Sequence, residues 1–74
     1  MKIIETKING VLIIEPEIYT DDRGWFAEVY NKNRLKELNI DIDFIQDNQS
    51  FNNKMGTLRG LHFQNEPYAQ TKLV

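Results

Sequence analysis

Short apolar runs, separated by polar turns, recur along the first half of the chain with the spacing of β-strands. Residues 11–14 form an aliphatic run that ends at Pro16, which cannot donate to a sheet ladder. Residues 21–24, with the sequence DDRG, predict a turn. In residues 25–30 the side chains alternate, so that Glu28 falls between two aromatic residues on one face. This face is either solvated or directed into a partly apolar cavity in which Glu28 can bind a ligand.

The second half predicts one short helix followed by further strands. Residues 31–38 have a helical pattern, with Asn31 as a candidate N-cap and Asn39 as the residue that ends the helix. Residues 44–51, 57–64 and 70–74 have strand character, separated by a loop at 52–56 and a break at 65–67. The fold class is therefore mainly β with one short helix.

The last apolar run, at residues 73–74, has the character of the start of a strand. A β-domain that stops inside a strand has an open edge and an unclosed core. We expect residues 1–74 to be a single incomplete domain, which more chain or a second subunit completes.

Composition narrows the function classes. The 74 residues contain no cysteine, and nine basic against eleven acidic residues give a net charge of −2. Without a basic surface, nucleic acid is not an expected partner. No segment has the length and apolarity of a signal peptide or a membrane helix, so we expect no membrane association and a cytoplasmic protein.

His62 is the only histidine, and a lone histidine between apolar neighbours is more often structural than catalytic. A metal site is not expected, because such sites need several converging ligands and Gln64 stands where a second histidine would help. Arg59 lies three residues before His62, so in a regular strand the two side chains would point to opposite faces. A shared site therefore requires a kink, for which Gly60 is suited.

Three cations in separate segments, Arg23, Arg59 and Lys72, are each more often surface residues than ligand-binding groups. Phe26 could stack on a base, although core filling is the usual role of an aromatic residue. The polar run Gln46, Asp47 and Asn48 is uncommon in a purely structural strand.

Taken together, four motifs resemble the dTDP-4-dehydrorhamnose 3,5-epimerase family. They are DRGWFAE at 22–28, FIQDNQS at 44–50, GTLRGLHFQ at 56–64 and AQTKLV at 69–74. The third is the most specific, and the resemblance covers essentially the whole chain. It implies the N-terminal part of a cupin-type β-jelly roll, a homodimer, and a dTDP-linked 4-keto-6-deoxy sugar as substrate. It also implies a place in dTDP-L-rhamnose biosynthesis, and no metal or nicotinamide cofactor.

The resemblance also implies roles for individual residues. His62 matches the family's proton acceptor, and Lys72 matches the cation near the oxyanion that develops on O4. Substrate-binding roles fall on Arg23, Phe26, Glu28, Gln46, Asp47, Asn48 and Arg59. Gln49 departs from the histidine that many relatives carry.

Family chains are more than twice as long, and the acid that orients the histidine and the opposing tyrosine belong to the part that these 74 residues lack. We therefore expect the 74 residues alone to be severely impaired. Two other functions remain open: a non-catalytic module that binds a nucleotide-sugar, and a structural β-fragment. Within the family, inversion of only C3 or only C5 is also open.

Overall fold

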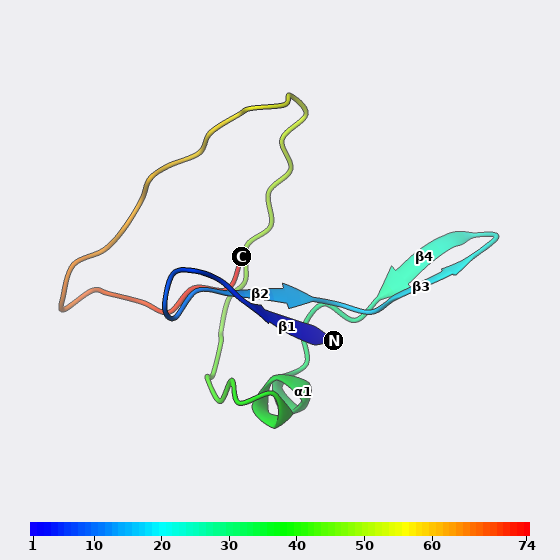
Figure 1. Cartoon of the computed structure of the whole chain (residues 1–74), viewed down its shortest axis with the longest axis horizontal. Coiled ribbons are helices and arrows are strands. Elements are labelled where there is room, and N and C mark those ends of the chain that lie inside the picture. Colours follow the sequence, from blue (N-terminus) through cyan, green and yellow to red (C-terminus); the bar gives the residue numbers. More distant parts are fainter. The chain divides into compact units, whose positions relative to one another are not determined.

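Two antiparallel β-hairpins and one short helix make up the regular structure of the protein, in a computed structural model that describes all 74 residues (Figure 1). The elements run in the order β1 (Lys2–Glu5), β2 (Leu12–Glu15), β3 (Ile18–Asp21), β4 (Gly24–Ala27) and α1 (Lys32–Glu37). The chain divides into two units, Met1–Asp43 and Phe44–Val74. The predicted fold class, mainly β with one short helix, is confirmed.

The first hairpin pairs β1 with β2, with Ile3 opposite Ile14 and Ile4 opposite Ile13. Its loop is closed by Thr6, whose hydroxyl donates to the backbone carbonyl of Val11 over 2.8 Å. The strand predicted at residues 11–14 is shifted by one residue. Strand β1 was not predicted, because Lys2 and Glu5 flank only two apolar residues and leave no alternating pattern to detect.

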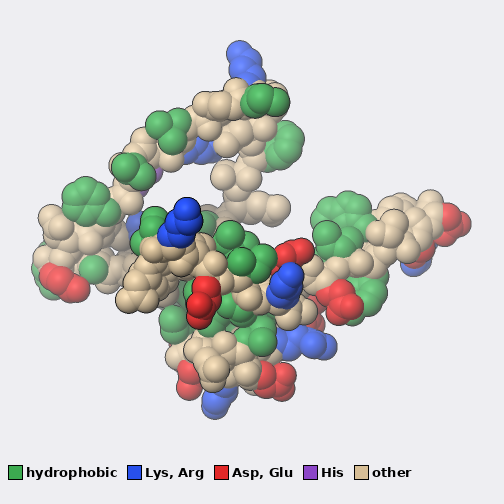
Figure 2. All heavy atoms as spheres, viewed as in Figure 1, with side chains coloured by type: hydrophobic (Ala, Val, Ile, Leu, Met, Phe, Trp, Pro, Cys, Tyr) green, Lys and Arg blue, Asp and Glu red, His purple; other side chains and the backbone are tan.

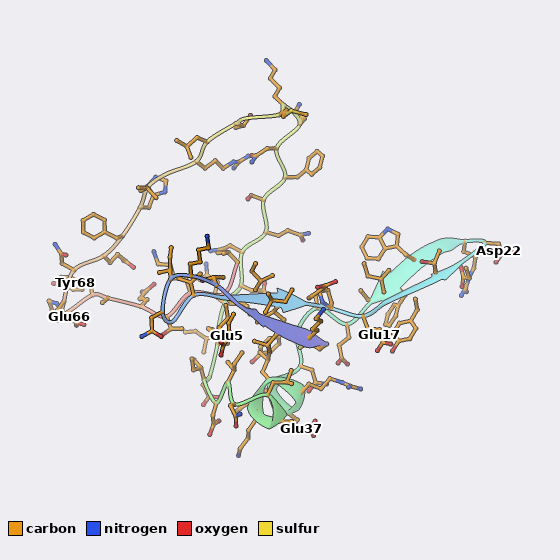
Figure 3. The ribbon with its side chains drawn as sticks, in the orientation of Figure 1. Glu5, Glu17, Asp22, Glu37, Glu66 and Tyr68 are labelled. Carbon is orange, nitrogen blue, oxygen red and sulfur yellow. The ribbon has the colours of Figure 1, made fainter.

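The second hairpin pairs β3 with β4 across the predicted turn, with Asp21 opposite Gly24. Asp21 makes the turn through its side chain, because its Oδ1 accepts a hydrogen bond from the backbone nitrogen of Arg23 over 2.9 Å. Gly24 has φ +134, a backbone conformation that residues with a Cβ atom rarely adopt. In Figure 3, Asp22 marks the tip of this hairpin.

The helix α1 begins and ends as the sequence predicts. Asn31 caps it through Oδ1, which accepts the backbone N–H of Arg34 over 3.1 Å. At the other end Asn39 takes a left-handed conformation with φ +66, and the N–H of Ile40 donates to the carbonyl of Leu35 over 2.8 Å. No helix in the structure is long and apolar enough to span a bilayer.

Leu35 is the only buried hydrophobic residue, at 2% exposure. Large apolar side chains elsewhere stay in solvent, among them Trp25 at 72% and Ile45 at 100% exposure. Figure 2 shows many such side chains, in green, on the visible surface. The first unit therefore has a very small core, and its hairpins depend mostly on their ladder hydrogen bonds.

The strands predicted at residues 44–51, 57–64 and 70–74 are wrong for this structure, because no strand forms in the second unit. A strand requires a partner for its backbone groups. One backbone hydrogen bond joins distant segments here, from the N–H of Asn48 to the carbonyl of Leu73 over 3.4 Å. Turns form at the predicted loop and at the predicted break, since the N–H of Thr57 donates to the carbonyl of Lys54 over 3.4 Å and the N–H of Tyr68 donates to that of Asn65 over 2.8 Å.

Candidate functional site

In the second unit, His62 lies in an exposed segment that has no strand partner. A shared site for Arg59 and His62 was expected to require a kink at Gly60. No strand runs through Gly60 in the structure, and its φ is +116. A Cβ atom at position 60 would lie 3.5 Å from Nδ1 of His62. The imidazole therefore turns back against the glycine, and a positive φ at this position bends the chain between Arg59 and His62.

Arg59 is held within its own segment rather than beside His62. Its Nε donates to Oδ1 of Asn52 over 2.7 Å, and its Nη2 donates to the carbonyl oxygen of Phe51 over 3.2 Å. Both contacts are at the surface, so water or a ligand can compete for them. The guanidinium is thus placed by the predicted loop at 52–56 and its preceding residue.

The polar run at 46–48 lies beside the segment that contains Lys72. The backbone bond from Asn48 to Leu73 joins the two segments, and Nε2 of Gln46 donates to Oδ1 of Asn48 over 3.2 Å. Asp47 and Lys72 are exposed. The structure thus brings the polar run and the Lys72 segment together, but no hydrogen bond or ion pair joins His62, Arg59 and Lys72.

In the first unit, Arg23 and Phe26 lie on the β3–β4 hairpin. Arg23 donates from Nη2 to Oδ2 of Asp21 over 2.5 Å, and this hydrogen bond holds the pKa of Asp21 below its usual 3.8 and raises that of Arg23. Phe26 is 69% exposed and lies opposite Tyr19 in the ladder, on the same face. Phe26 therefore does not fill a core, and its ring is open to solvent.

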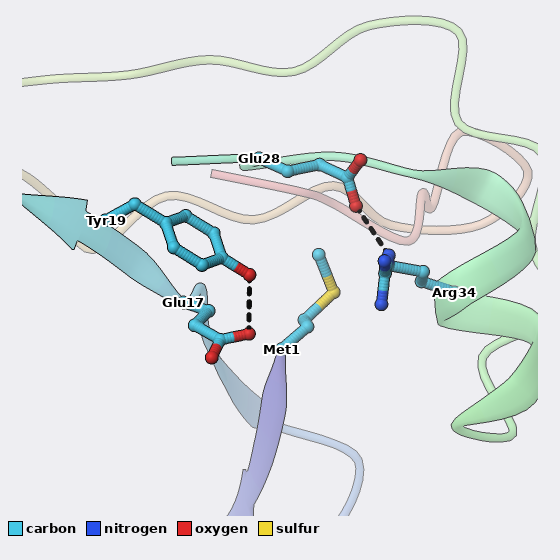
Figure 4. A pocket seen from close by; sticks show the side chains of 5 residues that line it. All are labelled: Met1, Glu17, Tyr19, Glu28 and Arg34. Atoms are coloured by element: carbon cyan, nitrogen blue, oxygen red, sulfur yellow. Dashed lines mark hydrogen bonds and ion pairs between the residues drawn. The ribbon is translucent and has the colours of Figure 1, made fainter. Parts of the chain in front are cut away.

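Glu28 follows β4 and lines a small pocket of about 50 Å³ together with Met1, Glu17, Tyr19 and Arg34 (Figure 4). The sequence left two interpretations of this carboxylate, a solvated face or a partly apolar cavity. In the structure the Glu28 side chain is 43% exposed, and the other residues that line the pocket are mostly polar. Across the same pocket the Tyr19 hydroxyl donates to Oε2 of Glu17 over 2.9 Å. This hydrogen bond and the negative charge of Glu17 raise the pKa of Tyr19 above its usual 10.0.

Two contacts of Glu28 were not predicted from the sequence. Nε of Arg34 lies 2.8 Å from Oε1 of Glu28, and Nδ2 of Asn31 donates to Oε2 over 3.3 Å. A signal was available, because an acid three residues before a helix cap is within reach of that cap. No group of three His, Asp or Glu side chains gathers as a metal ion would require.

Comparison with known proteins gives the same family over nearly the whole chain. The model of the family described as dTDP-4-dehydrorhamnose 3,5-epimerase matches residues 5–74. The chain belongs to this family. No solved structure matches it.

Individual relatives of the dTDP-4-dehydrorhamnose 3,5-epimerase family agree with this assignment. A protein of that name from Shigella flexneri is 49% identical over 75 residues, which cover 100% of this chain and 41% of the relative. One from Methanothermobacter thermautotrophicus is 48% identical over 73 residues, covering 99% of this chain and 38% of the relative. One from Escherichia coli strain K12 is 48% identical over 75 residues, covering 100% of this chain and 40% of the relative. The chain therefore spans about 40% of the length of these relatives.

Proposed function

We propose that this chain is the N-terminal portion of an isomerase that inverts C3 and C5 of dTDP-4-dehydro-6-deoxy-D-glucose. The product is dTDP-4-dehydro-L-rhamnose, a precursor of dTDP-L-rhamnose. The observation that carries the proposal is the family match over residues 5–74, which includes the segment around His62. The names of the relatives, dTDP-4-dehydrorhamnose 3,5-epimerase, support the substrate class and the two centres.

His62 is the proposed base. The C4 ketone acidifies the hydrogens on C3 and C5, and an imidazole has a pKa suited to removing them near neutral pH. The proton passes to an imidazole nitrogen, and the electron pair of the broken C–H bond moves into an enolate with its charge on O4. Return of a proton to the opposite face inverts the centre. No electron is gained or lost in the cycle, so the reaction as proposed consumes no oxidant or reductant.

Lys72 is the proposed cation for the enolate. Its ammonium stabilises a charge on O4 that is larger in the transition state than in the bound ketone, which is the condition for lowering a barrier. The hydrogen bond between Asn48 and Leu73 supports a shared location for Lys72 and the polar run at 46–48. In this proposal Gln46, Asp47 and Asn48 contact the nucleotide-sugar on one side of the site.

The remaining binding roles fall on Arg59 and on three residues of the first unit. The forked guanidinium of Arg59 suits a diphosphate, and its contacts with Phe51 and Asn52 are exposed enough to exchange for phosphate oxygens. The open ring of Phe26 supports a stacking role on the base. Arg23 and Glu28 are the other proposed nucleotide contacts.

A cytoplasmic homodimer with a cupin-type jelly roll is the proposed setting. The exposed apolar side chains of the hairpins, such as Ile13 and Trp25, support association because such surface is stabilised when covered. The orienting acid and the opposing tyrosine of the proposed mechanism lie outside residues 1–74. Accordingly the 74-residue chain by itself is proposed to be severely impaired.

The test follows deuterium in heavy water. The product of the complete coding sequence is incubated with dTDP-4-dehydro-6-deoxy-D-glucose, and incorporation at C3 and C5 is read by NMR. We expect exchange at both carbons, lost in His62→Ala and retained in Lys54→Ala, which changes an exposed side chain of the 52–56 loop. Exchange no faster than the protein-free rate would overturn the epimerase proposal, and exchange at one carbon only would reassign the protein to a single-centre epimerase.

A non-catalytic nucleotide-sugar module is the second candidate. It is favoured by a specific contrast: Glu28 is held by two partners in a pocket, whereas His62 makes no hydrogen bond. The same samples decide between the two functions. Saturable dTDP binding with no exchange supports the module, and exchange that depends on His62 excludes it.

A further inference from the structure

The carboxylate of Glu28 is held at both oxygens by the first turn of α1. Nε of Arg34 lies 2.8 Å from Oε1 of Glu28, and Nδ2 of Asn31 donates to Oε2 over 3.3 Å. Two donors from different directions favour one orientation of the carboxylate, although both contacts are partly exposed. Because each oxygen has a further lone-pair site, the group can still accept a hydrogen bond from a ligand.

Asn31 serves two groups with one side chain. Its Oδ1 accepts the N–H of Arg34 as the helix cap, and its Nδ2 donates to Glu28. The amide therefore couples the start of α1 to the end of β4. An aspartate at this position would cap the helix equally well, but it would offer no donor and would place a second negative charge beside Glu28.

The turn that holds Glu28 is itself fixed in place. Leu35, the residue after Arg34, is 2% exposed, and its N–H donates to the carbonyl of Asn31 over 3.0 Å. The Glu28–Arg34 pair lines the pocket of about 50 Å³, as Figure 4 shows. A polar group of a ligand that enters this pocket can meet the Glu28 carboxylate.

Charge adds a second argument. A bare carboxylate repels the diphosphate of a nucleotide-sugar, and Arg34, 2.8 Å away, offsets the charge of Glu28, while Glu17 adds a second carboxylate to the same pocket. The ion pair is partly exposed, with the side chain of Arg34 at 59% and that of Glu28 at 43%. Its contribution to the stability of the unit is accordingly small. Its main effects are to orient the Glu28 carboxylate and to neutralise its charge.

We propose that Asn31 and Arg34 are positioning residues that direct the Glu28 carboxylate toward an N–H or O–H donor of the bound dTDP-sugar. The inference rests on the proposed function, in which Glu28 contacts the nucleotide. Neither residue belongs to the four motifs that carry the family resemblance. Residues 31 and 34 thereby tune the affinity of the site through Glu28 and do not touch the substrate.

The experiment is a double-mutant cycle on the product of the complete coding sequence. Affinity for dTDP is measured by calorimetry in Arg34→Ala, Glu28→Ala and the double variant. We expect Arg34→Ala to weaken binding about two- to fivefold, the range of an exposed ion pair, and to have no further effect when Glu28 is already alanine. Lys36→Ala removes a cation from the same helix without a contact to Glu28 and serves as the matched control.

Two conservative variants separate positioning from folding. Asn31→Asp keeps the cap, so helix content by circular dichroism stays at the wild-type value while dTDP binding weakens. Arg34→Lys restores the charge without the Nε geometry, so it recovers part of the loss. In the epimerase assay these variants raise KM and leave kcat within about twofold, a range of about 0.4 kcal/mol in the barrier.

The outcomes distinguish this inference from the function on which it rests. A wild-type protein that binds dTDP while Arg34→Ala and Asn31→Asp bind it equally well overturns the positioning role alone. An equal loss from Arg34→Ala with and without Glu28 also overturns it, since Arg34 then acts independently. A wild-type protein that binds no dTDP overturns both proposals.

Discussion

The imidazole of His62 turns back against Gly60, so that a Cβ atom on residue 60 would lie 3.5 Å from Nδ1 and 3.4 Å from the backbone nitrogen of His62. These separations are ordinary contact distances, and a methyl group fits the space. The constraint at Gly60 is therefore its φ of +116, which only glycine adopts without strain. The direction of the proposed base depends on the backbone two residues before it.

Gly60→Ala is expected to reduce deuterium exchange at C3 and C5 by about tenfold. A side chain at positive φ costs ~1–2 kcal/mol, and relief of this strain moves the backbone that directs the His62 imidazole. Gly56→Ala is the matched control, since Gly56 has φ +78 and nothing near its Cβ position. The two variants carry a similar backbone cost, and only one borders His62. Equal exchange rates in the two would contradict a role for Gly60 in directing the base.

Leu35→Ala is expected to unfold α1. Removing a buried leucine costs ~2–5 kcal/mol, and Leu35 is the only buried hydrophobic residue of the chain. Circular dichroism at helical wavelengths and thermal melting measure the effect. Leu38→Ala, at the half-buried C-cap position that follows α1, should lower the stability less. A melt of Leu35→Ala that matches wild type would show that α1 is held by something other than this side chain.

The β3–β4 turn should weaken in acid. The hydrogen bonds from Arg23 lower the pKa of Asp21 below its usual 3.8, so the folded turn holds fewer protons than the unfolded chain. Its stabilisation is fully present above pH 3.8 and is lost as the pH falls through the lower folded pKa. Carboxyl NMR titration should show the Asp21 midpoint rise toward 3.8 in Arg23→Gln.

Asp43 provides an internal control in that titration. Its pKa is lowered by the hydrogen bond and the charge of Lys32, which Arg23→Gln leaves in place. The Asp43 midpoint should therefore stay constant while that of Asp21 moves. If both midpoints move together, a general change in charge, and not the Arg23 side chain, sets the pKa of Asp21.

Arg59→Gln is expected to weaken dTDP binding roughly 10- to 100-fold, as the loss of charged hydrogen bonds predicts. The variant keeps donors but loses the charge and the fork. Lys54→Gln removes a cation from the neighbouring loop and should bind dTDP as wild type does. Calorimetry measures dTDP binding by the two variants. If Arg59→Gln and Lys54→Gln bind dTDP equally well, Arg59 does not belong to the proposed site.

Local features were predictable from the sequence, and long-range ones were not. Asn31 as cap, Asn39 as the end of the helix and the turn at residues 21–24 all depend on groups a few residues apart, and all three form. The strands predicted at 44–51 and 57–64 depend on partners elsewhere, and no partner pairs with them in this chain. An alternating apolar pattern predicts which face of a strand is buried, but it does not identify the segment that covers this face.

In the candidate site, too, the sequence identifies residues but not the contacts that depend on how the chain turns. The family motifs single out His62, Arg59 and Lys72, but the sequence cannot show that Arg59 binds its own loop through Asn52. The contacts of Glu28 with Asn31 and Arg34 were equally hidden, because they require the chain to turn between β4 and α1. Spacing along a chain predicts such pairs only when the turn between them is known.

The near absence of buried side chains has a consequence in the cell. Apolar residues such as Phe63 and Met55, at 80% and 104% exposure, are the features that chaperones and proteases recognise in unfinished proteins. Residues 1–74 on their own would present this apolar surface to such factors until further chain or a second subunit covers it. The lifetime of the polypeptide, and not only its chemistry, then depends on how quickly its apolar surface is covered.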